Sequence, residues 1–456
     1  MGNTKNSTAT TPNATSMPDA TPQNSLIYGL DDRPPLREAL FAALQHLLAI
    51  FVAIITPPLI IAGALQADIE TTSTLVSTAL IASGISTFIQ CRRIGPVGCG
   101  LLCIQGTSFS FIGPIISAGL SGGLATVFGA CIVGSSVEIA ISRVLKYTKH
   151  IITPLVSGIV VTLIGMSLIK VGITACGGGQ EAIANNTFGS LRFVGLAALV
   201  LVSIIIFNRS SNRYLRMSSI VIGLAIGYIA AYLMGMVDFS SVSGHKLLNL
   251  PHPFKYGLKF DPAAIIGLAL IYMITAIEAY GDIPANSLIS GQPVEGPLFV
   301  KRASGGIMGD GVGSLISGCL CCFPNSIFAQ NNGMIQLTGV ASRYVGYFIA
   351  AMLIILGLFP VIGTIFSLMP GPVLGGATLL MFGTVAAAGI KIIASQEINR
   401  KATLVIALSF SLGLSVELVP EILSQLPTTL KNLFSSGITT GGLTAILCNL
   451  VIRIKE

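Results

Sequence analysis

Residues 323–339, with the sequence FPNSIFAQNNGMIQLTG, decide how the whole chain is interpreted. The segment lies between two strongly apolar stretches, where a chain would cross a bilayer, yet it carries proline, asparagine, serine and glutamine. Lipid offers no hydrogen bonds to free backbone groups, so non-helical backbone at this depth must be buried in protein or line a cavity. The stretch therefore predicts an extended piece, a helix that begins near Asn331, and a polar cavity inside a membrane protein.

The composition agrees with a multi-pass membrane protein. Of the 456 residues, 52% are hydrophobic and only 9% are charged, and the mean hydropathy is +0.84; soluble domains carry about 25% charged residues. The nine cysteines lie mostly within apolar runs and are expected to be small buried residues rather than metal ligands. The net charge of +7 comes from basic residues between the apolar runs, so nucleic acid is not an expected partner.

The apolar runs predict an all-α membrane protein with fourteen spans. Residues 1–24 are rich in Ser, Thr, Asn and Pro and are expected to form a disordered polar tail in the cytoplasm, followed by one membrane domain at 25–456. Each predicted span is near the ~20 residues that a crossing helix needs. The spans are 43–66, 71–90, 98–116, 121–142, 151–169, 193–207, 217–236, 262–284, 304–322, 324–341, 344–361, 372–390, 403–418 and 432–452.

The basic residues indicate the orientation of these spans. If the N-terminus is cytoplasmic, most of the 25 lysines and arginines fall on the inner side. Cytoplasmic loops are enriched in such residues. An even number of spans then also places the C-terminus in the cytoplasm. The outer side holds only Lys170, Arg192, Lys246, Lys255, Lys259 and Lys431.

Two pairs of similar stretches indicate an internal repeat. TPLVSG at 153–158 resembles GPVLGG at 371–376, and the same offset sets IQGTSFSFIGP at 104–114 opposite CFPNSIFAQNN at 322–332. Seven spans separate the members of each pair, so the two copies would point in opposite directions, as in many secondary transporters. Interrupted spans at matching positions point to a binding site near the bilayer midplane.

Ionisable residues within the spans are candidates for that site. Glu278 and Asp282 are four residues apart and share one helix face, and two carboxylates so close resist joint ionisation. Asp310, His46 and Glu138 lie in other spans. A charge at the bilayer centre costs ~2.5–3.5 kcal/mol on insertion scales, so such residues normally face a polar pathway.

Structural roles compete with this interpretation. Asp282 and Asp310 could instead make helix-end hydrogen bonds, and His46 fits a packing role as well as a supporting role at the site. Glu138 lies near the basic end of its span, so pairing with Arg143 or reaching toward the interface is the expectation there. The amide of Gln330 can donate and accept, which suits either a heterocycle or a helix cap.

The sequence limits the energy source and the chemistry. It contains no phosphate-binding loop ending in GK[ST] and no HExxH pattern, so neither ATP nor a metal cofactor is expected. A channel or uniporter that uses the same cavity remains an alternative to a coupled transporter. A membrane-embedded enzyme with Glu278, Asp282 and Asp310 as acid and base is a further one.

The motif Gln330-Asn331-Asn332-Gly333, followed after four residues by Thr338-Gly339, resembles the signature of the nucleobase–ascorbate transporter family. The glutamine–histidine pair before residue 47, the acidic pair of the eighth span and the TSFSF break agree with this resemblance. The stretches MVDFSSV, PHPFKYG and SLIKVGI resemble the family's bacterial xanthine:proton symporters. The resemblance covers essentially the whole chain after residue 25.

The resemblance implies fourteen spans in two inverted seven-span repeats, with short extended pieces that break spans 3 and 10. A core would comprise residues 43–142 and 262–361, and a gate residues 151–236 and 372–452. It implies the following site residues: Glu278 and Gln330 as hydrogen-bonding partners of a purine, Phe109 and Ser108 as the opposite wall, Asn331 and His46 as residues that shape the site, and Asp282 and Asp310 as residues that support coupling.

The implied function is proton-coupled uptake of a purine base across a bacterial inner membrane, without a cofactor and with a homodimer as the assembly. Glutamine at the start of the motif, Gln330, resembles the purine branch of the family, whereas the uracil branch carries Glu at that position. Ser108 stands where some xanthine-specific relatives carry Asn, so a smaller side chain would admit uric acid as well as xanthine. A uracil-type permease, a uniporter and a sulfate-type anion carrier are the alternatives.

Overall fold

The computed structural model describes residues 26–148, 153–212, 215–216, 218–237, 250–427, 430–431, 434 and 436–452. The predicted tail at 1–24 lies outside this part. The described chain is predominantly helical, and eight of its helices are long and apolar enough to cross a membrane. They are α1 (Leu36–Ala64), α2 (Ile69–Arg92), α3 (Ile112–Thr148, counted with the preceding turn), α4 (Pro154–Cys176), α6 (Leu191–Asn208), α9 (Pro262–Ile289), α14 (Gly371–Ala394) and α15 (Arg400–Leu418).

Helices outside this group of eight account for most of the remaining described sequence. The helices α12 (Arg343–Leu358) and α13 (Pro360–Ser367) form a pair bent by 77°, which raises the count within the described residues to nine if the pair is one span. The remaining elements are α5 (Gly179–Ala184), α8 (Ser219–Leu233), α10 (Gly296–Cys319), α11 (Gln330–Thr338), α17 (Gly437–Val451), and the 3-10 turns η1 (Phe109–Phe111) and η3 (Pro420–Leu423). The count of fourteen spans stays a prediction.

Two strands interrupt the helices where the sequence predicts extended pieces. β1 (Gln105–Thr107) pairs antiparallel with β2 (Asn325–Ile327), with Gly106 opposite Ser326. Backbone bonds extend the pairing on both sides, since Ser108 N donates to Pro324 O over 2.9 Å and Phe328 N to Ile104 O over 3.0 Å. The two breaks therefore satisfy each other's backbone groups, as burial in a membrane requires.

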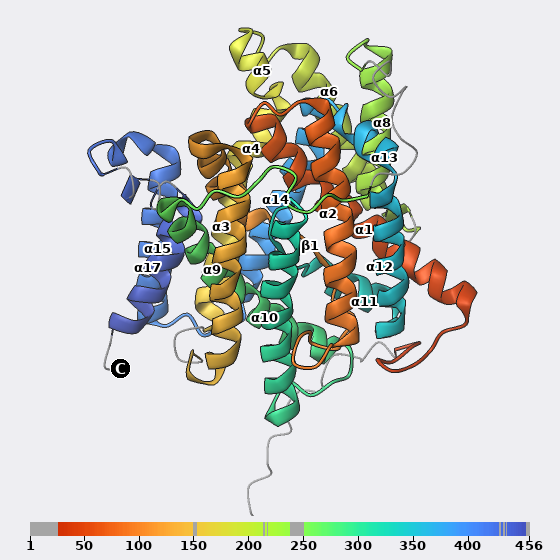
Figure 1. Cartoon of the computed structure of the whole chain (residues 1–456), viewed down its shortest axis with the longest axis vertical. Helices are drawn as coiled ribbons and strands as arrows, with labels where there is room; N and C mark the ends of the chain where they lie inside the picture. The colour runs from red at the N-terminus through yellow and green to blue at the C-terminus, as the bar shows by residue number, and fades with distance from the viewer. Residues whose placement is uncertain are drawn as a thin grey trace, which may run out of the picture.

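A half-helix follows each strand. After β1 the chain turns through η1 into α3, and Gly123, at φ 74° and ψ −178°, breaks α3 into a short first part and a longer second part. After β2 the half-helix is α11, which begins at Gln330, next to the predicted Asn331. Figure 1 shows β1 and α11 at mid-height among the long helices.

The helices pack in two sets around this centre. In one set α2 packs on α12, and α3 on α9 and α10. In the other α4 packs on α14, α6 on α8, and α15 on α17. Figure 1 shows α15 and α17 at one edge of the molecule and α12 at the opposite edge. The strand pair lies against the first set, where β1 contacts α1 and α2.

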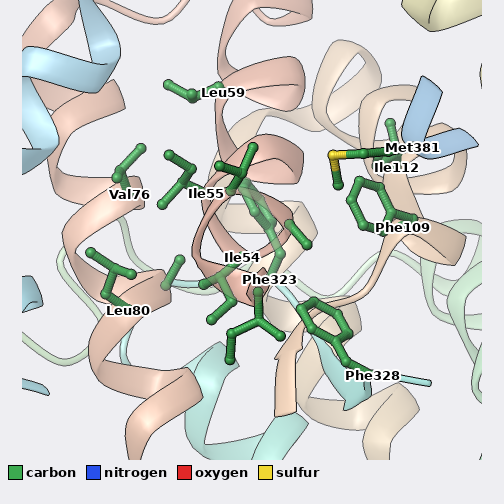
Figure 2. Close-up of a cluster of buried hydrophobic side chains, with 14 of the residues drawn as sticks. Ile54, Ile55, Leu59, Val76, Leu80, Phe109, Ile112, Phe323, Phe328 and Met381 are labelled. Carbon is green, nitrogen blue, oxygen red and sulfur yellow. The ribbon is translucent and has the colours of Figure 1, made fainter. Parts of the chain in front are cut away.

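Apolar side chains hold the strand pair in place. Figure 2 shows Ile54 from α1 beside Phe323 and Phe328, which flank β2. Gly106 of β1 approaches them so closely that an added Cβ would lie 2.5 Å from the Phe328 ring and 2.7 Å from Ile54. Real Cβ atoms do not come this near to other atoms, so the close packing of β1 against Phe328 and Ile54 depends on a residue without a side chain.

Candidate functional site

A cavity of ≈ 220 Å³ lies where the strand pair, α9, α4 and α14 meet. The non-helical segments around β1 and β2 contribute polar atoms to the cavity, and α4 and α14 contribute a mostly apolar wall. Ligand sites commonly combine such an apolar lining with a few placed polar groups. The lining residues are Ser108, Phe109, Ser110, Val161, Ile164, Glu278, Asp282, Ser326, Ile327, Phe328, Ala329, Gln330, Thr384, Val385, Ala388 and Ile392.

The acidic side of the cavity comes from α9. Glu278 and Asp282 both line it, as their four-residue spacing on one helix face predicts. Ser110 Oγ donates to Glu278 Oε2 over 3.4 Å, a long bond that leaves the carboxyl available to a ligand. Asp282 makes no hydrogen bond to any described residue, which leaves its carboxyl exposed to whatever fills the cavity.

The amide side of the cavity comes from the start of α11. Gln330 is the first residue of that helix, and its exposed side chain lines the cavity with no hydrogen bond to the described residues. A glutamine that capped α11 would be bonded to its backbone, which is not what the structure has. Glu278 and Gln330, which are far apart in the sequence, thus line one space, as the sequence analysis expects.

Ser108 and Phe109 form a further part of the wall, directly after β1. The Phe109 ring meets the Phe382 ring of α14 edge to face, with centroids 5.5 Å apart. Figure 2 shows Phe109 close to Met381, also of α14. Phe109 is therefore a point of contact between the strand region and the apolar wall, and its side chain is 8% exposed.

Asn331 and His46 do not line the cavity but lie behind it, fully buried. Asn331 Nδ2 donates to Leu102 O over 2.6 Å, and its Oδ1 lies 2.8 Å from His46 Nδ1. His46 Nε2 has no hydrogen-bond partner among the described residues. The two side chains hold the first turn of α11, and with it Gln330, against α1 and the residues before β1.

Asp310 also lies outside the cavity lining, buried in α10. Its Oδ1 accepts from Gln90 Nε2 over 2.9 Å and from Gln105 Nε2, the side chain of the first residue of β1. Asp310 Oδ2 has no partner within the described chain. The carboxyl therefore fixes the start of β1 rather than facing the cavity.

The expectation for Glu138 was wrong. Its side chain is fully buried in α3 and neither reaches the interface nor pairs with Arg143. It accepts a hydrogen bond of 3.2 Å from Thr275 Oγ1 of α9, and its second oxygen, Oε2, is unpartnered in the described residues. The longer second part of α3 packs on α9 and α10 there, which turns this face of α3 inward.

The sequence analysis missed three amide residues that support the site. Gln90 and Gln105 hold Asp310, and Asn286 Nδ2 donates to Leu102 O over 3.0 Å and to Asn332 Oδ1 over 2.9 Å. All three are buried. Their one sequence signal is an amide within an apolar stretch, which the sequence analysis used only for residues 323–339.

A cavity between two broken segments and membrane helices, with a few polar groups in its lining, is typical of secondary transporters. The comparison with family models agrees, because residues 37–422 match the model of a permease family. The chain belongs to this family, the nucleobase–ascorbate transporters that the motif at residues 330–339 resembles. It is a multi-pass membrane permease and not an enzyme.

Curated relatives match along nearly their whole length. The chain is 50% identical to xanthine permease XanP of Escherichia coli, with 98% of both chains covered. It is 47% identical to xanthine permease XanQ of the same organism, with 94% of both covered. Identity to uric acid permease PucJ of Bacillus subtilis is 35%, with 91% of this chain and 92% of that one covered.

Solved structures of similar fold are more distant in sequence. The transmembrane domain of the cyanobacterial bicarbonate transporter BicA aligns with a TM-score of 0.58 at 16% identity, covering 90% of this chain and 99% of that one. The inward-facing murine Slc26a9 anion transporter aligns with a TM-score of 0.61 at 11% identity, covering 91% and 69%. These similarities show a shared transporter fold.

Proposed function

We propose that the chain takes up a purine base, xanthine or uric acid, together with a proton across a bacterial inner membrane. The observation that carries this proposal is that Glu278 and Gln330 line one cavity from two different elements. A carboxyl group and an amide together supply hydrogen-bond donors and acceptors that match the edge of an oxopurine. Relatives named as xanthine and uric acid permeases support the same substrate class.

The cavity suits a small planar base better than an inorganic anion. It presents two carboxyl groups, Glu278 and Asp282, and no lysine, arginine or histidine among its lining residues. A site for sulfate or bicarbonate relies on cations or helix N-termini. The one helix start described above in this lining, that of α11 at Gln330, shares the cavity with two carboxyl groups, which disfavour a further negative charge. The apolar wall of α4 and α14 gives the face of a heterocycle a surface to pack on.

The surroundings of these carboxyl groups support proton coupling. Glu278 and Asp282 are a helical turn apart, with no basic residue in the cavity lining. Two carboxylates one helical turn apart resist joint ionisation, so a proton that enters the site would allow a largely neutral base to bind without excess charge. No resident cofactor is required, and the proton is the co-transported ion.

The proposed architecture has fourteen spans in two inverted repeats, with both termini in the cytoplasm. Support comes from α4 and α14, which each begin with proline in the first turn and pack on each other. A core of residues 43–142 and 262–361 would move against a gate of residues 151–236 and 372–452, in a homodimer. The cavity lies between these two parts.

Uptake of radiolabelled xanthine tests the function, in cells that lack their own purine permeases, with and without a protonophore. We expect accumulation above the external concentration that collapses when the protonophore is added. Accumulation that withstands the protonophore would contradict proton coupling, and equilibration without accumulation would indicate a uniporter. Competition by uric acid, hypoxanthine, guanine and uracil identifies the preferred base; strong competition by uracil alone would indicate a uracil-type permease.

A further inference from the structure

Glu138 is the buried acidic group for which the site described above has no use. It belongs to α3, lies outside the cavity lining and is 0% exposed. Its ionisable neighbours that act on it electrostatically are both acidic, Asp310 of α10 and Glu278 of α9, and no cation among the described residues does so. A buried carboxylate with acidic neighbours and no cation is costly, so the carboxyl must hold a proton for at least part of the time.

Thr275 connects Glu138 to the cavity. Its hydroxyl lies 3.2 Å from Glu138 Oε1 and 3.2 Å from the backbone oxygen of Tyr272, one turn earlier on α9. Thr275 also precedes Glu278 by three residues, on the same side of that helix. The Thr275 hydroxyl thus joins Glu138 to the helix that carries Glu278 into the cavity lining. Asp310, whose carboxyl holds the start of β1, acts on Glu138 electrostatically.

The Thr275 hydroxyl can satisfy both charge states of Glu138. A hydroxyl has one hydrogen to donate and two lone pairs that accept. When Glu138 is ionised, Thr275 donates to its carboxylate. When Glu138 is protonated, the carboxylic acid donates to Thr275, which turns its own hydrogen to Tyr272 O. The bond between Thr275 and Glu138 Oε1 is therefore kept in either state, as a group that gains and loses a proton during turnover requires, while Oε2 has no hydrogen-bond partner among the described residues.

We propose that Glu138 holds the coupled proton in part of the transport cycle, exchanging it with Glu278 and Asp310. This inference rests on the proposed proton-coupled uptake and adds the buried carboxyl of Glu138 to the groups that hold the proton. In this arrangement the proton moves away from the cavity when the base leaves, so Glu278 is free to release its ligand. Glu138 acts through the proton and does not touch the base.

Purified protein in proteoliposomes tests the proposal, with internal pH followed by a dye and xanthine by radiolabel. At 100 mV a coupled proton supports about fiftyfold accumulation of xanthine. We expect Glu138→Gln, which cannot release a proton, to exchange internal for external xanthine at a rate within about threefold of that of the unchanged chain. At the same voltage its ratio of internal to external xanthine is expected to stay at about one, so that xanthine does not accumulate. Xanthine-driven proton entry is also expected to disappear. Glu295→Gln, an exposed position at the start of α10, is the matched control and is expected to behave as the unchanged chain.

Full accumulation and unchanged proton entry in Glu138→Gln would overturn the proposal. If that variant does not fold, Glu138→Asp and Thr275→Val provide the test, since the first keeps a titrating group and the second removes the hydroxyl. We expect Glu138→Asp to retain coupled uptake and Thr275→Val to shift its pH profile. Loss of coupling in Glu138→Asp, or an unshifted profile in Thr275→Val, would contradict the role proposed for Glu138 and its hydroxyl partner. Absence of proton entry in the unchanged chain would instead overturn the proposed function itself.

Discussion

His46 Nδ1 lies 2.8 Å from Asn331 Oδ1, and this bond joins the middle of α1 to the first turn of α11. Both side chains are buried, and Asn331 is bonded at its other end to Leu102 O. Gln330 directly precedes Asn331 and is proposed to bind the purine. Its position therefore depends on His46, which does not line the cavity. The relationship gives His46 a role that its sequence position left open.

His46→Ala is expected to raise the KM for xanthine about tenfold, because a buried acceptor left unpaired costs ~1–3 kcal/mol. His46→Asn keeps a donor and is expected to recover part of the affinity. Initial uptake rates over a range of xanthine concentrations, at matched surface expression, measure both. His252→Ala, at an exposed position outside the helices, is the control. An unchanged KM in His46→Ala would mean that α11 is held without this bond.

Glu278→Gln is expected to abolish measurable uptake. The variant keeps the size of the side chain but loses both the proton site and a charge-assisted hydrogen bond, which alone is worth ~1.5–3 kcal/mol, or roughly 10- to 100-fold in affinity. Binding of xanthine to the purified variant by calorimetry separates the loss of affinity from the loss of coupling. Undiminished uptake would remove Glu278 from the site.

The sequence was sufficient for a helical membrane fold and for the acidic and amide residues of the cavity because polar residues in apolar spans are costly and therefore conspicuous. Ser108 and Phe109 came from the family resemblance, and no local pattern indicated the apolar wall that α4 and α14 contribute. The break at 323–339 located β2 and α11, and Glu278, Gln330, Ser108 and Phe109 all line the cavity. Glu138 was misinterpreted because distance from a helix end says nothing about which way a face turns. That depends on how α3 packs against α9 and α10, a long-range contact that no local pattern encodes.

Ser108→Asn is expected to narrow selectivity toward xanthine. Ser108 is 2% exposed and lines the cavity directly after β1, so a larger side chain there reduces the space beside the base. A substrate that carries an extra oxygen, such as uric acid, is expected to lose about tenfold or more in competition, since overpacking costs ~1–3 kcal/mol. Inhibition of xanthine uptake by uric acid measures the effect, and Ser121→Asn, outside the cavity lining, is the control. Equal loss of both bases would indicate a general defect instead.

Gly106→Ala is expected to destabilise the protein by ~1–3 kcal/mol, because the new methyl group would overlap the Phe328 ring. Since β1 carries Ser108 and Phe109 into the cavity, uptake is expected to fall as well. Gly113→Ala is the matched control, because an added Cβ at that position meets no atom within 4 Å. Thermal unfolding of the two detergent-purified variants compares their stability. An equal Tm would show that the side chains around Gly106 can shift to accommodate the methyl group.

A cross-link between α4 and α9 tests whether the predicted gate moves against the predicted core. An ideal Cβ at Gly281 lies 3.8 Å from the Cβ of Ser157, which is the mean separation in disulfides. Gly281 also lies between Glu278 and Asp282, so the bond would join the two parts beside the cavity. In the Ser157→Cys, Gly281→Cys double variant, oxidation is expected to stop uptake and reduction to restore it. Each single variant, treated with the same oxidant, controls for oxidative damage to the native cysteines. The untreated activity of the single variants gives the baseline for the double variant, because Gly281 is closely packed and its replacement alone can lower uptake. Transport that continues while the cross-link is intact, as judged by thiol titration, would show that α4 and α9 do not separate during turnover, and the moving boundary would then have to lie elsewhere.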